Sequence, residues 1–223
     1  FTGRYGYGSQ TRRDGSTLSV ENSKFDNNAN SDMRIHASQV HFIDNQTNFN
    51  GGDVEVYSGS TDNSGSEIWS KLNDGTYYFS GSASIKNKVT IEEGASFEMG
   101  TDVILSVSGS ESSINAVGSS GDLITFSGRS KAKGAWGGLL ITSSSVDNLM
   151  NHVKIEYGGG KVLATYSDKA NLAVHNDGRL TLKNSYIENS AKYGIIERSS
   201  HNAHLTTDNV TYSNNTDANL HTD

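Results

Sequence analysis

Two glutamates offer the sharpest candidate chemistry in this chain. Glu156 and Glu188 each follow an isoleucine, so that Ile155-Glu156 and Ile187-Glu188 align as matching dipeptides. If both isoleucines point into a core, both glutamates point outward on adjacent or near-adjacent coils, because side chains alternate along a strand. Like charges at that spacing repel. We therefore expect either a compensating cation or one carboxyl with a raised pKa that acts as a general acid.

Other polar and aromatic residues near these glutamates complete the candidate site. Ligand-binding roles are assigned to His152, Lys154, Tyr157, Lys183 and Tyr166. Retaining glycosidases hold two carboxyls about 5–5.5 Å apart, and lyases use a base beside a carboxylate that Lys or Ca²⁺ neutralises. Glu156 and Glu188 are thus the catalytic candidates if the protein is an enzyme. The competing interpretation is that Lys154 and Lys183 only screen the glutamates.

Calcium is the one cofactor that the sequence leaves open. Asp- and Asn-rich turns supply the oxygen ligands that Ca²⁺ prefers. They lie at Asp26-Asn27-Asn28, Asp32, Asp44-Asn45, Asp62-Asn63 and Asp217. None matches an EF-hand loop or a glycine-rich nonapeptide repeat, so solvated turns are the competing interpretation. The absence of Cys excludes disulfides, thiol nucleophiles and zinc–thiolate sites.

Composition limits the class of partner. The net charge of −7 and the isoelectric point of about 5.4 argue against nucleic acid, because no basic stripe is present to neutralise phosphates. No apolar run approaches the roughly 18 residues of a membrane span. Only 33% of residues are hydrophobic, and the mean hydropathy is −0.55. This polarity suits a thin structure in which each strand buries a single row of side chains.

Short strand patterns recur along the chain and position these residues. Alternating apolar segments such as Leu18-Ser19-Val20, Val89-Thr90-Ile91 and Leu180-Thr181-Leu182 are bounded by Asn, Asp, Gly or Ser. The absence of Pro agrees with nearly continuous β pairing, since Pro cannot donate to a strand ladder. Spacing between similar segments is uneven. A fixed strand pattern with variable coil length is typical of a parallel β-helix.

The two ends of the chain repeat one another. Residues 4–35 and 192–222 align, with an offset of 187 residues between Leu18 and Leu205. The pattern predicts a stretch of a tandem array. Its parts are residues 1–57 as terminal coils of one unit, 58–66 as a Gly/Ser-rich linker and 67–223 as a second unit that stops at the equivalent point. Open solenoid ends also predict end-to-end self-association.

Motifs between about Tyr77 and Ile141 carry a family resemblance. They are Thr90-Ile91-Glu92-Glu93-Gly94, Ile114-Asn115-Ala116-Val117-Gly118, Ile124-Thr125-Phe126 and Trp136-Gly137-Gly138-Leu139-Leu140-Ile141. In this order they resemble the first coils of right-handed parallel β-helix proteins from bacterial cell surfaces, although Glu93 and Leu123 replace prolines common in that family. The resemblance implies an all-β, right-handed parallel β-helix with irregular coil lengths and protruding loops, secreted or displayed on a bacterial cell surface.

The β-helix interpretation places individual side chains. Ile155, Ile187 and Tyr212 should stack in one inward row, and Asn189 and Asn214 should stack at an inward turn. Trp136 lies among small residues and is expected to fix a coil rather than to bind sugar. The loop Gly158–Ala170 should protrude. Exposed tyrosines, Tyr5, Tyr7, Tyr77, Tyr78, Tyr157 and Tyr166, are candidates for stacking on sugars or on a protein partner.

Three functions remain open at this point. The leading one is an extracellular structural and adhesive β-helix, part of a tandem-repeat surface protein, that binds a polysaccharide or a cell-surface protein. The alternative is a polysaccharide lyase or glycoside hydrolase that uses the outward carboxylates. A weaker alternative is binding to ice or another ordered surface. A cleft with loop walls over the glutamates would favour the enzyme, whereas a flat solvated face would favour the scaffold.

Overall fold

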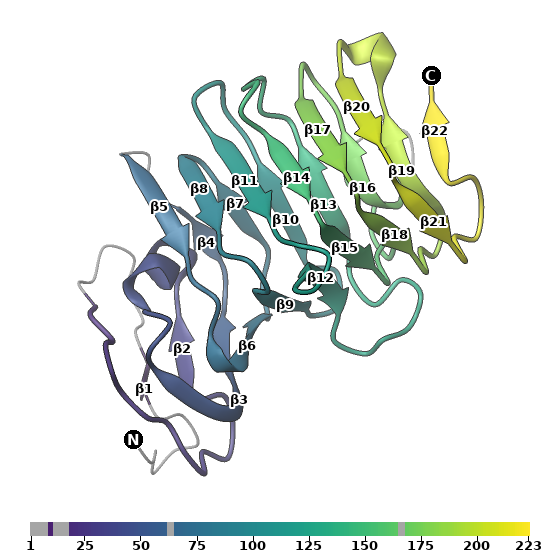
Figure 1. The fold of residues 1–223 in the computed structure, drawn as a ribbon. Coiled ribbons are helices and arrows are strands. Elements are labelled where there is room, and N and C mark those ends of the chain that lie inside the picture. Colours follow the sequence, from purple (N-terminus) through teal and green to yellow (C-terminus); the bar gives the residue numbers. More distant parts are fainter. Residues whose placement is uncertain (1–8, 11–17, 62–64, 165–167) are drawn as a thin grey trace.

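The computed structural model describes residues 9–10, 18–61, 65–164 and 168–223, and it is built almost wholly of parallel β-strands (Figure 1). A nine-stranded sheet has the order β1 (Ser9–Gln10), β2 (Met33–Ile35), β3 (Asn48–Val56), β6 (Asn73–Phe79), β9 (Ser96–Met99), β12 (Ile124–Gly128), β15 (Val153–Glu156), β18 (Tyr186–Glu188), β21 (Thr211–Ser213). A seven-stranded sheet has the order β22 (Leu220–Thr222), β19 (Tyr193–Glu197), β16 (Ala170–Val174), β13 (Gly138–Ile141), β10 (Ile104–Val107), β7 (Ala83–Ile85), β4 (Gly59–Ser60). A six-stranded sheet has the order β20 (His204–Asp208), β17 (Arg179–Lys183), β14 (Leu149–Asn151), β11 (Ser113–Val117), β8 (Lys88–Ile91), β5 (Ser66–Trp69).

From β3 onward the chain visits the nine-, seven- and six-stranded sheets in turn, so each coil contributes one strand to each sheet. The result is a parallel β-solenoid of about seven turns, which confirms the predicted fold class. Measured on the nine-stranded sheet, coil length varies as expected, from 20 residues between Tyr77 and Phe97 to 32 between Ile155 and Ile187. Two short 3-10 helices, η1 (Ala37–Phe42) and η2 (Ser199–His201), interrupt the strands. No described helix has the length and apolar character needed to cross a membrane.

Large side chains stacked between the three sheets form the core. On the nine-stranded sheet, the rings of Tyr77 and Phe97 lie 5.3 Å apart, and those of Phe97 and Phe126 lie 5.1 Å apart, both nearly parallel. The same inward row continues through Ile155 and Ile187 to Tyr212, as the alignment predicts. The expectation that Tyr77 is a surface aromatic is wrong. Its ring is fully buried, its hydroxyl donates to the Ser70 carbonyl at 3.0 Å, and burial raises its pKa.

Left-handed residues turn the chain at two corners of each of the last coils. Tyr157, Asn189 and Asn214 follow β15, β18 and β21 with φ of 65°, 57° and 53°. The Asn214 amide donates to the Asn189 side-chain oxygen at 2.6 Å, which confirms the stack. The stack is not in the interior, however, because Asn214 is exposed. Asparagine suits these corners because its short side chain tolerates the left-handed conformation.

The other corner has the same construction. His152, Asn184 and Asn209 precede β15, β18 and β21 with φ of 52°, 46° and 51°. Asn209 donates to Asn184 at 2.8 Å, and Asn184 donates in turn to Asn151 at 2.9 Å. These amides form a ladder up the outside of the solenoid, so each coil stabilises the turn of the coil below it.

The two copies of the internal repeat share their turn residues, but the strands that follow these turns lie in different sheets. Asn22 and Asn27, with φ of 46° and 55°, match Asn209 and Asn214. The strands that follow differ, because β2 lies in the nine-stranded sheet and β22 lies in the seven-stranded sheet. Strand β4 lies within residues 58–66 and pairs with β7, and β5 begins at Ser66 and pairs with β8. The division into two units and a linker stays a prediction.

The loop Gly158–Ala170 does not stand free of the solenoid where the structure describes it. Leu163 is buried against Ala173 and Ile196 on the outer face of the seven-stranded sheet. Asp168 accepts two hydrogen bonds from the Arg198 guanidinium, which also pairs with Asp223. These contacts raise the pKa of Arg198 above its ordinary value, with the hydrogen bond to Asp168 as the main cause.

The aromatic stack should dominate the stability of the central coils. Replacing Phe97 with Ala removes a ring that contacts Tyr77 and Phe126, and leaves a cavity. We expect the free energy of unfolding to fall by about 3–5 kcal/mol in urea titrations followed by circular dichroism. Tyr186→Ala, on an exposed outward position of β18, is the control and should change it by about 0.5 kcal/mol or less. Equal losses in the two variants would contradict this account.

The asparagine corner can be tested separately. Asn189→Ala loses the amide ladder and forces a Cβ-bearing residue without a polar side chain to hold φ of 57°. Asn189→Gly loses the same hydrogen bond but adopts that φ freely. We expect the Ala variant to be less stable than the Gly variant by about 1 kcal/mol in urea unfolding. A Gly variant as unstable as the Ala variant would mean that backbone conformation is not the determining factor.

Candidate functional site on the outer face of the nine-stranded sheet

The structure brings the two candidate glutamates together. Glu156 ends β15, Glu188 ends β18, and the two residues pair in register on adjacent coils. Their isoleucine neighbours Ile155 and Ile187 are fully buried, so both glutamates lie on the outer face. Neighbouring strands are about 4.8 Å apart. The predicted placement of the pair is therefore confirmed.

A lysine of the same face lies between the two glutamates and offsets part of their charge. The Lys154 ammonium lies 3.0 Å from Glu156 Oε2 and 3.9 Å from Glu188 Oε2. Partial burial favours the neutral amine, but the hydrogen bond with Glu156 and the charges of both glutamates outweigh it, so the pKa of Lys154 is raised. Lys154 is therefore a fixed cation at neutral pH. It is a compensating cation of the kind that the sequence predicts for this pair.

The Glu156 side chain is nearly buried, and its surroundings hold it in place. Its side chain is only 9% exposed, and Oε1 accepts a hydrogen bond from the Ser127 hydroxyl at 3.0 Å. Its backbone carbonyl accepts one from the Trp136 indole at 2.8 Å, and Trp136 is fully buried. Trp136 thus fixes this coil, as expected from the small residues around it. Both carboxylate oxygens of Glu156 are occupied, whereas the Glu188 side chain is 21% exposed.

Charges of alternating sign extend from this pair toward the N-terminal coils. Lys131 donates to Ser127 at 3.0 Å and lies 3.0 Å from Glu98 Oε1. Arg129 lies 3.9 Å from the other oxygen of Glu98, and its Nη1 lies 2.7 Å from Asp53. We call the whole set the polar ladder. Its members are Asp53, Arg129, Glu98, Lys131, Ser127, Glu156, Lys154 and Glu188.

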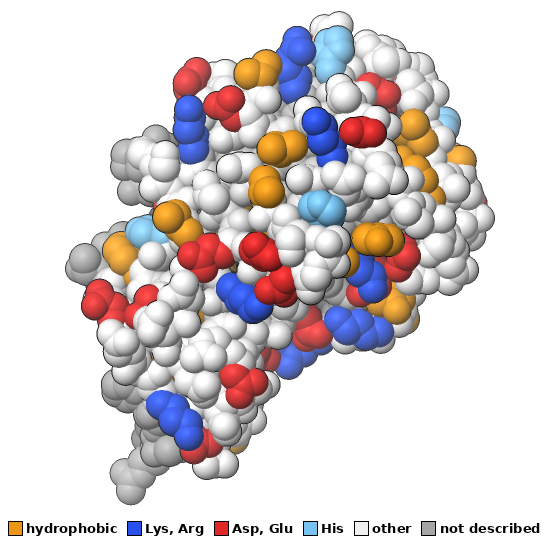
Figure 2. All heavy atoms as spheres, viewed as in Figure 1, with side chains coloured by type: hydrophobic (Ala, Val, Ile, Leu, Met, Phe, Trp, Pro, Cys, Tyr) orange, Lys and Arg blue, Asp and Glu red, His pale blue; other side chains and the backbone are white. Residues whose placement is uncertain are grey.

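A groove opens on the same face beside the polar ladder. It has a volume of about 780 Å³ and is lined by Asn30, Asp53, Glu55, Tyr78, Glu98, Arg129 and their neighbours. The Arg129 guanidinium lies over the Tyr78 ring at 4.0 Å, and Ser80 donates to Glu55 at 2.6 Å. Figure 2 shows acidic and basic side chains interleaved along the lower edge of the molecule, where its outline turns inward. Most of the side chains that line the groove are polar.

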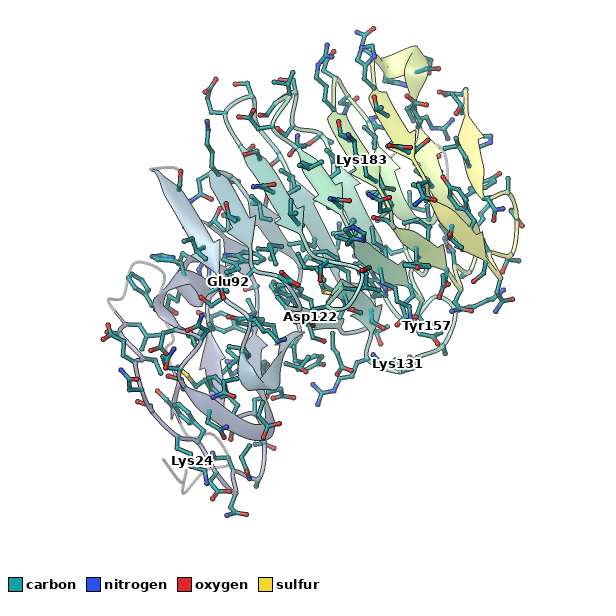
Figure 3. All side chains as sticks on the ribbon, viewed as in Figure 1. Lys24, Glu92, Asp122, Lys131, Tyr157 and Lys183 are labelled. Carbon is teal, nitrogen blue, oxygen red and sulfur yellow. The ribbon has the colours of Figure 1, made fainter. Side chains whose placement is uncertain are left out.

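The remaining predicted site residues lie around this face or away from it. His152 and Tyr157 occupy the corners before and after β15, and Tyr157 is partly buried against the core. Lys183 ends β17 in the six-stranded sheet, in register with Asn151 and Asp208. Figure 3 shows Lys183 well apart from Lys131 and Tyr157. Lys183 therefore does not share the face of the glutamates. Tyr166, Tyr5 and Tyr7 lie outside the described residues.

Most of the Asp- and Asn-rich turns use their oxygens internally. Asp44 accepts from the Thr47 backbone and hydroxyl and from the Asn22 backbone. Burial alone would raise the pKa of Asp44, but these hydrogen bonds lower it overall. Asp26 accepts from Asn50 at 2.9 Å. Among the residues that the structure describes, no three His, Asp or Glu side chains are grouped to hold a metal ion. Asp62 and Asn63 lie outside them.

Sequence reasoning missed Arg129, Lys131, Glu98 and Asp53. Their spacing carries no periodic signal, because the coils that separate them differ in length. In comparisons with models of protein families, with curated proteins and with solved structures, nothing matches this chain. The parallel β-solenoid is shown by its geometry, while the link to bacterial cell-surface proteins stays a prediction.

The role of Lys154 can be tested by removing its charge. Lys154→Met leaves two carboxylates facing one another, one of them nearly buried. We expect the free energy of unfolding at pH 7 to fall by roughly 2–3 kcal/mol. This loss is smaller than that for a fully buried ion pair, because the lysine is partly exposed.

The matched control for this test is the double variant Lys154→Met with Glu156→Gln. It removes one charge of each sign from the cluster, so most of the stability at pH 7 should return. Urea unfolding of the three proteins at pH 7 measures the effect. A double variant that stays as unstable as Lys154→Met would show that lost packing, and not charge, explains the Lys154→Met result.

Proposed function

We propose that this chain is an extracellular structural and adhesive β-helix whose outer nine-stranded face binds glycans or neighbouring proteins. The observation that carries the proposal is the polar ladder. It fixes charged and hydrogen-bonding groups from β3 to β18 on one rigid face, next to an open polar groove. Preorganised polar groups of this kind suit recognition, because little side-chain entropy is lost on binding.

The environment of the glutamates supports adhesion over catalysis. Both carboxylate oxygens of Glu156 already have partners, Ser127 and Lys154. The pKa of Lys154 is raised, so that lysine stays protonated and cannot act as a base at neutral pH. The groove lies over β3, β6 and β9, and β9 is two strands from the β15 of Glu156 and three from the β18 of Glu188. A lyase or hydrolase activity of the two glutamates remains the alternative that the experiment below separates.

Binding to an ordered surface has less support. The outward row of the nine-stranded sheet that contains Thr76, Ser96 and Thr125 continues through Lys154 and Tyr186. A long charged side chain and an aromatic ring interrupt the flat array of small hydroxyl groups that such binding needs. We therefore do not extend the proposal to ice.

The test is a panel of neutral and acidic polysaccharides, scored for both binding and turnover. We expect binding without new reducing ends or unsaturated uronate products. Arg129→Ala should weaken binding about tenfold, since Arg129 joins the groove to the polar ladder. Lys183→Ala, on another sheet, is the control and should bind as the wild type does. Turnover that disappears in Glu156→Gln or Glu188→Gln would overturn the proposal and identify an enzyme.

A further inference from the structure

A second pair of carboxylates stacks on the nine-stranded sheet, at its N-terminal end. Asp32 and Asp53 directly precede Met33 and Val54, which pair in register, and the Asp32 amide donates to the Asp53 carbonyl at 2.8 Å. Met33 and Val54 are fully buried, so the two aspartates lie on the outward side. This geometry repeats that of Glu156 and Glu188 at the other end of the same sheet.

The aspartate pair differs from the glutamate pair in the partners of its carboxylate oxygens. Asp32 Oδ1 accepts from Asn28 at 2.7 Å, and Asp53 Oδ2 pairs with Arg129 at 2.7 Å. Among the described residues, the other oxygen of each aspartate is buried and has no hydrogen-bond partner. Asp32 is only 4% exposed as a residue. A buried carboxylate oxygen without a partner is costly, so this arrangement requires something to satisfy it.

The aspartate pair lies at the edge of the groove. Asp53 lines the groove together with Asn30, Ser31 and Gly52, whereas Asp32, its in-register neighbour, is buried. A Cβ placed on Gly52 would lie 1.9 Å from Asp32 Oδ2, so only glycine accommodates the carboxylate there. Burial raises the pKa of Asp32, the hydrogen bond from Asn28 opposes this, and the charges of Asp53 and Asp26 add to the rise.

We propose that Asp32 Oδ2 and Asp53 Oδ1 bind one divalent cation at the edge of the groove, and that Ca²⁺ is the ion that fits. Two carboxylate oxygens, nearby backbone and side-chain oxygens and water match the hard-oxygen coordination that Ca²⁺ takes. The ion would fill the place that Lys154 fills in the glutamate pair. The proposal does not rest on glycan binding, although Asp53 also lines the groove. It assigns a cofactor to Asp32, which the sequence nominates, and to Asp53, which it does not.

The experiment measures thermal unfolding and isothermal titration calorimetry of the full chain after removal of metal by a chelator. We expect CaCl₂ at saturating concentration to raise the melting temperature by about 4 °C or more, with one ion bound per chain. Asp32→Asn and Asp53→Asn should each abolish the shift and the heat of binding. Glu188→Gln is the matched control, because its acidic pair already contains Lys154, and it should respond as the wild type does.

Two results would overturn the proposal. One is a calcium response that survives in Asp32→Asn, which would place the ion elsewhere. The other is no calcium response in the wild type together with a higher melting temperature of metal-free Asp32→Asn, which would show that the pair shares a proton. Circular dichroism of each variant before titration separates a loss of binding from a loss of fold. Glycan binding is scored in its own assay, so failure of either proposal leaves the other testable.

Discussion

In-register pairing of parallel strands brings each outward side chain within reach of its counterparts one coil above and one coil below. Whatever is placed at one position must therefore be compatible with a near-copy of itself about 4.8 Å away. Aromatic rings meet this condition by stacking, as Phe97 and Phe126 do. Asparagines meet it by donating to one another, as Asn214 does to Asn189. Carboxylates cannot meet it alone, and the polar ladder follows from that constraint.

How far the sequence predicts the structure depends on whether a feature is local to a coil. Ile155, Ile187 and Tyr212 were predictable as one row because similar short segments mark the same place in successive coils. The prediction that Tyr77 is exposed was wrong because side chains alternate along a strand, and the sequence does not show which of the adjacent Tyr77 and Tyr78 points inward. Lys183 was misplaced because one corner separates it from the sheet of Glu188. Loop contacts such as Asp168 with Arg198 span 30 residues and leave no periodic trace.

The candidate site was predictable in part for the same reason. The pairing of Glu156 with Glu188 and the proximity of Lys154 follow from a matching dipeptide and from alternation along a single strand. Arg129 and Lys131 reach the face from the turn after β12, and their partners depend on how many residues each intervening coil contains. A sequence with uneven coils does not encode that register in its spacing, so three-dimensional structure was needed to connect them.

One member of the polar ladder has a mechanical consequence. A load along the solenoid axis pulls coils apart, and the backbone hydrogen bonds between neighbouring strands would then open one coil at a time. Arg129, at the end of β12, reaches Asp53 on β3 and so spans β6 and β9. That contact joins coils that are not neighbours, so tension that separates any of the coils between β3 and β12 also strains this ion pair. A load on one inter-coil step is thus shared, in part, with the steps beside it.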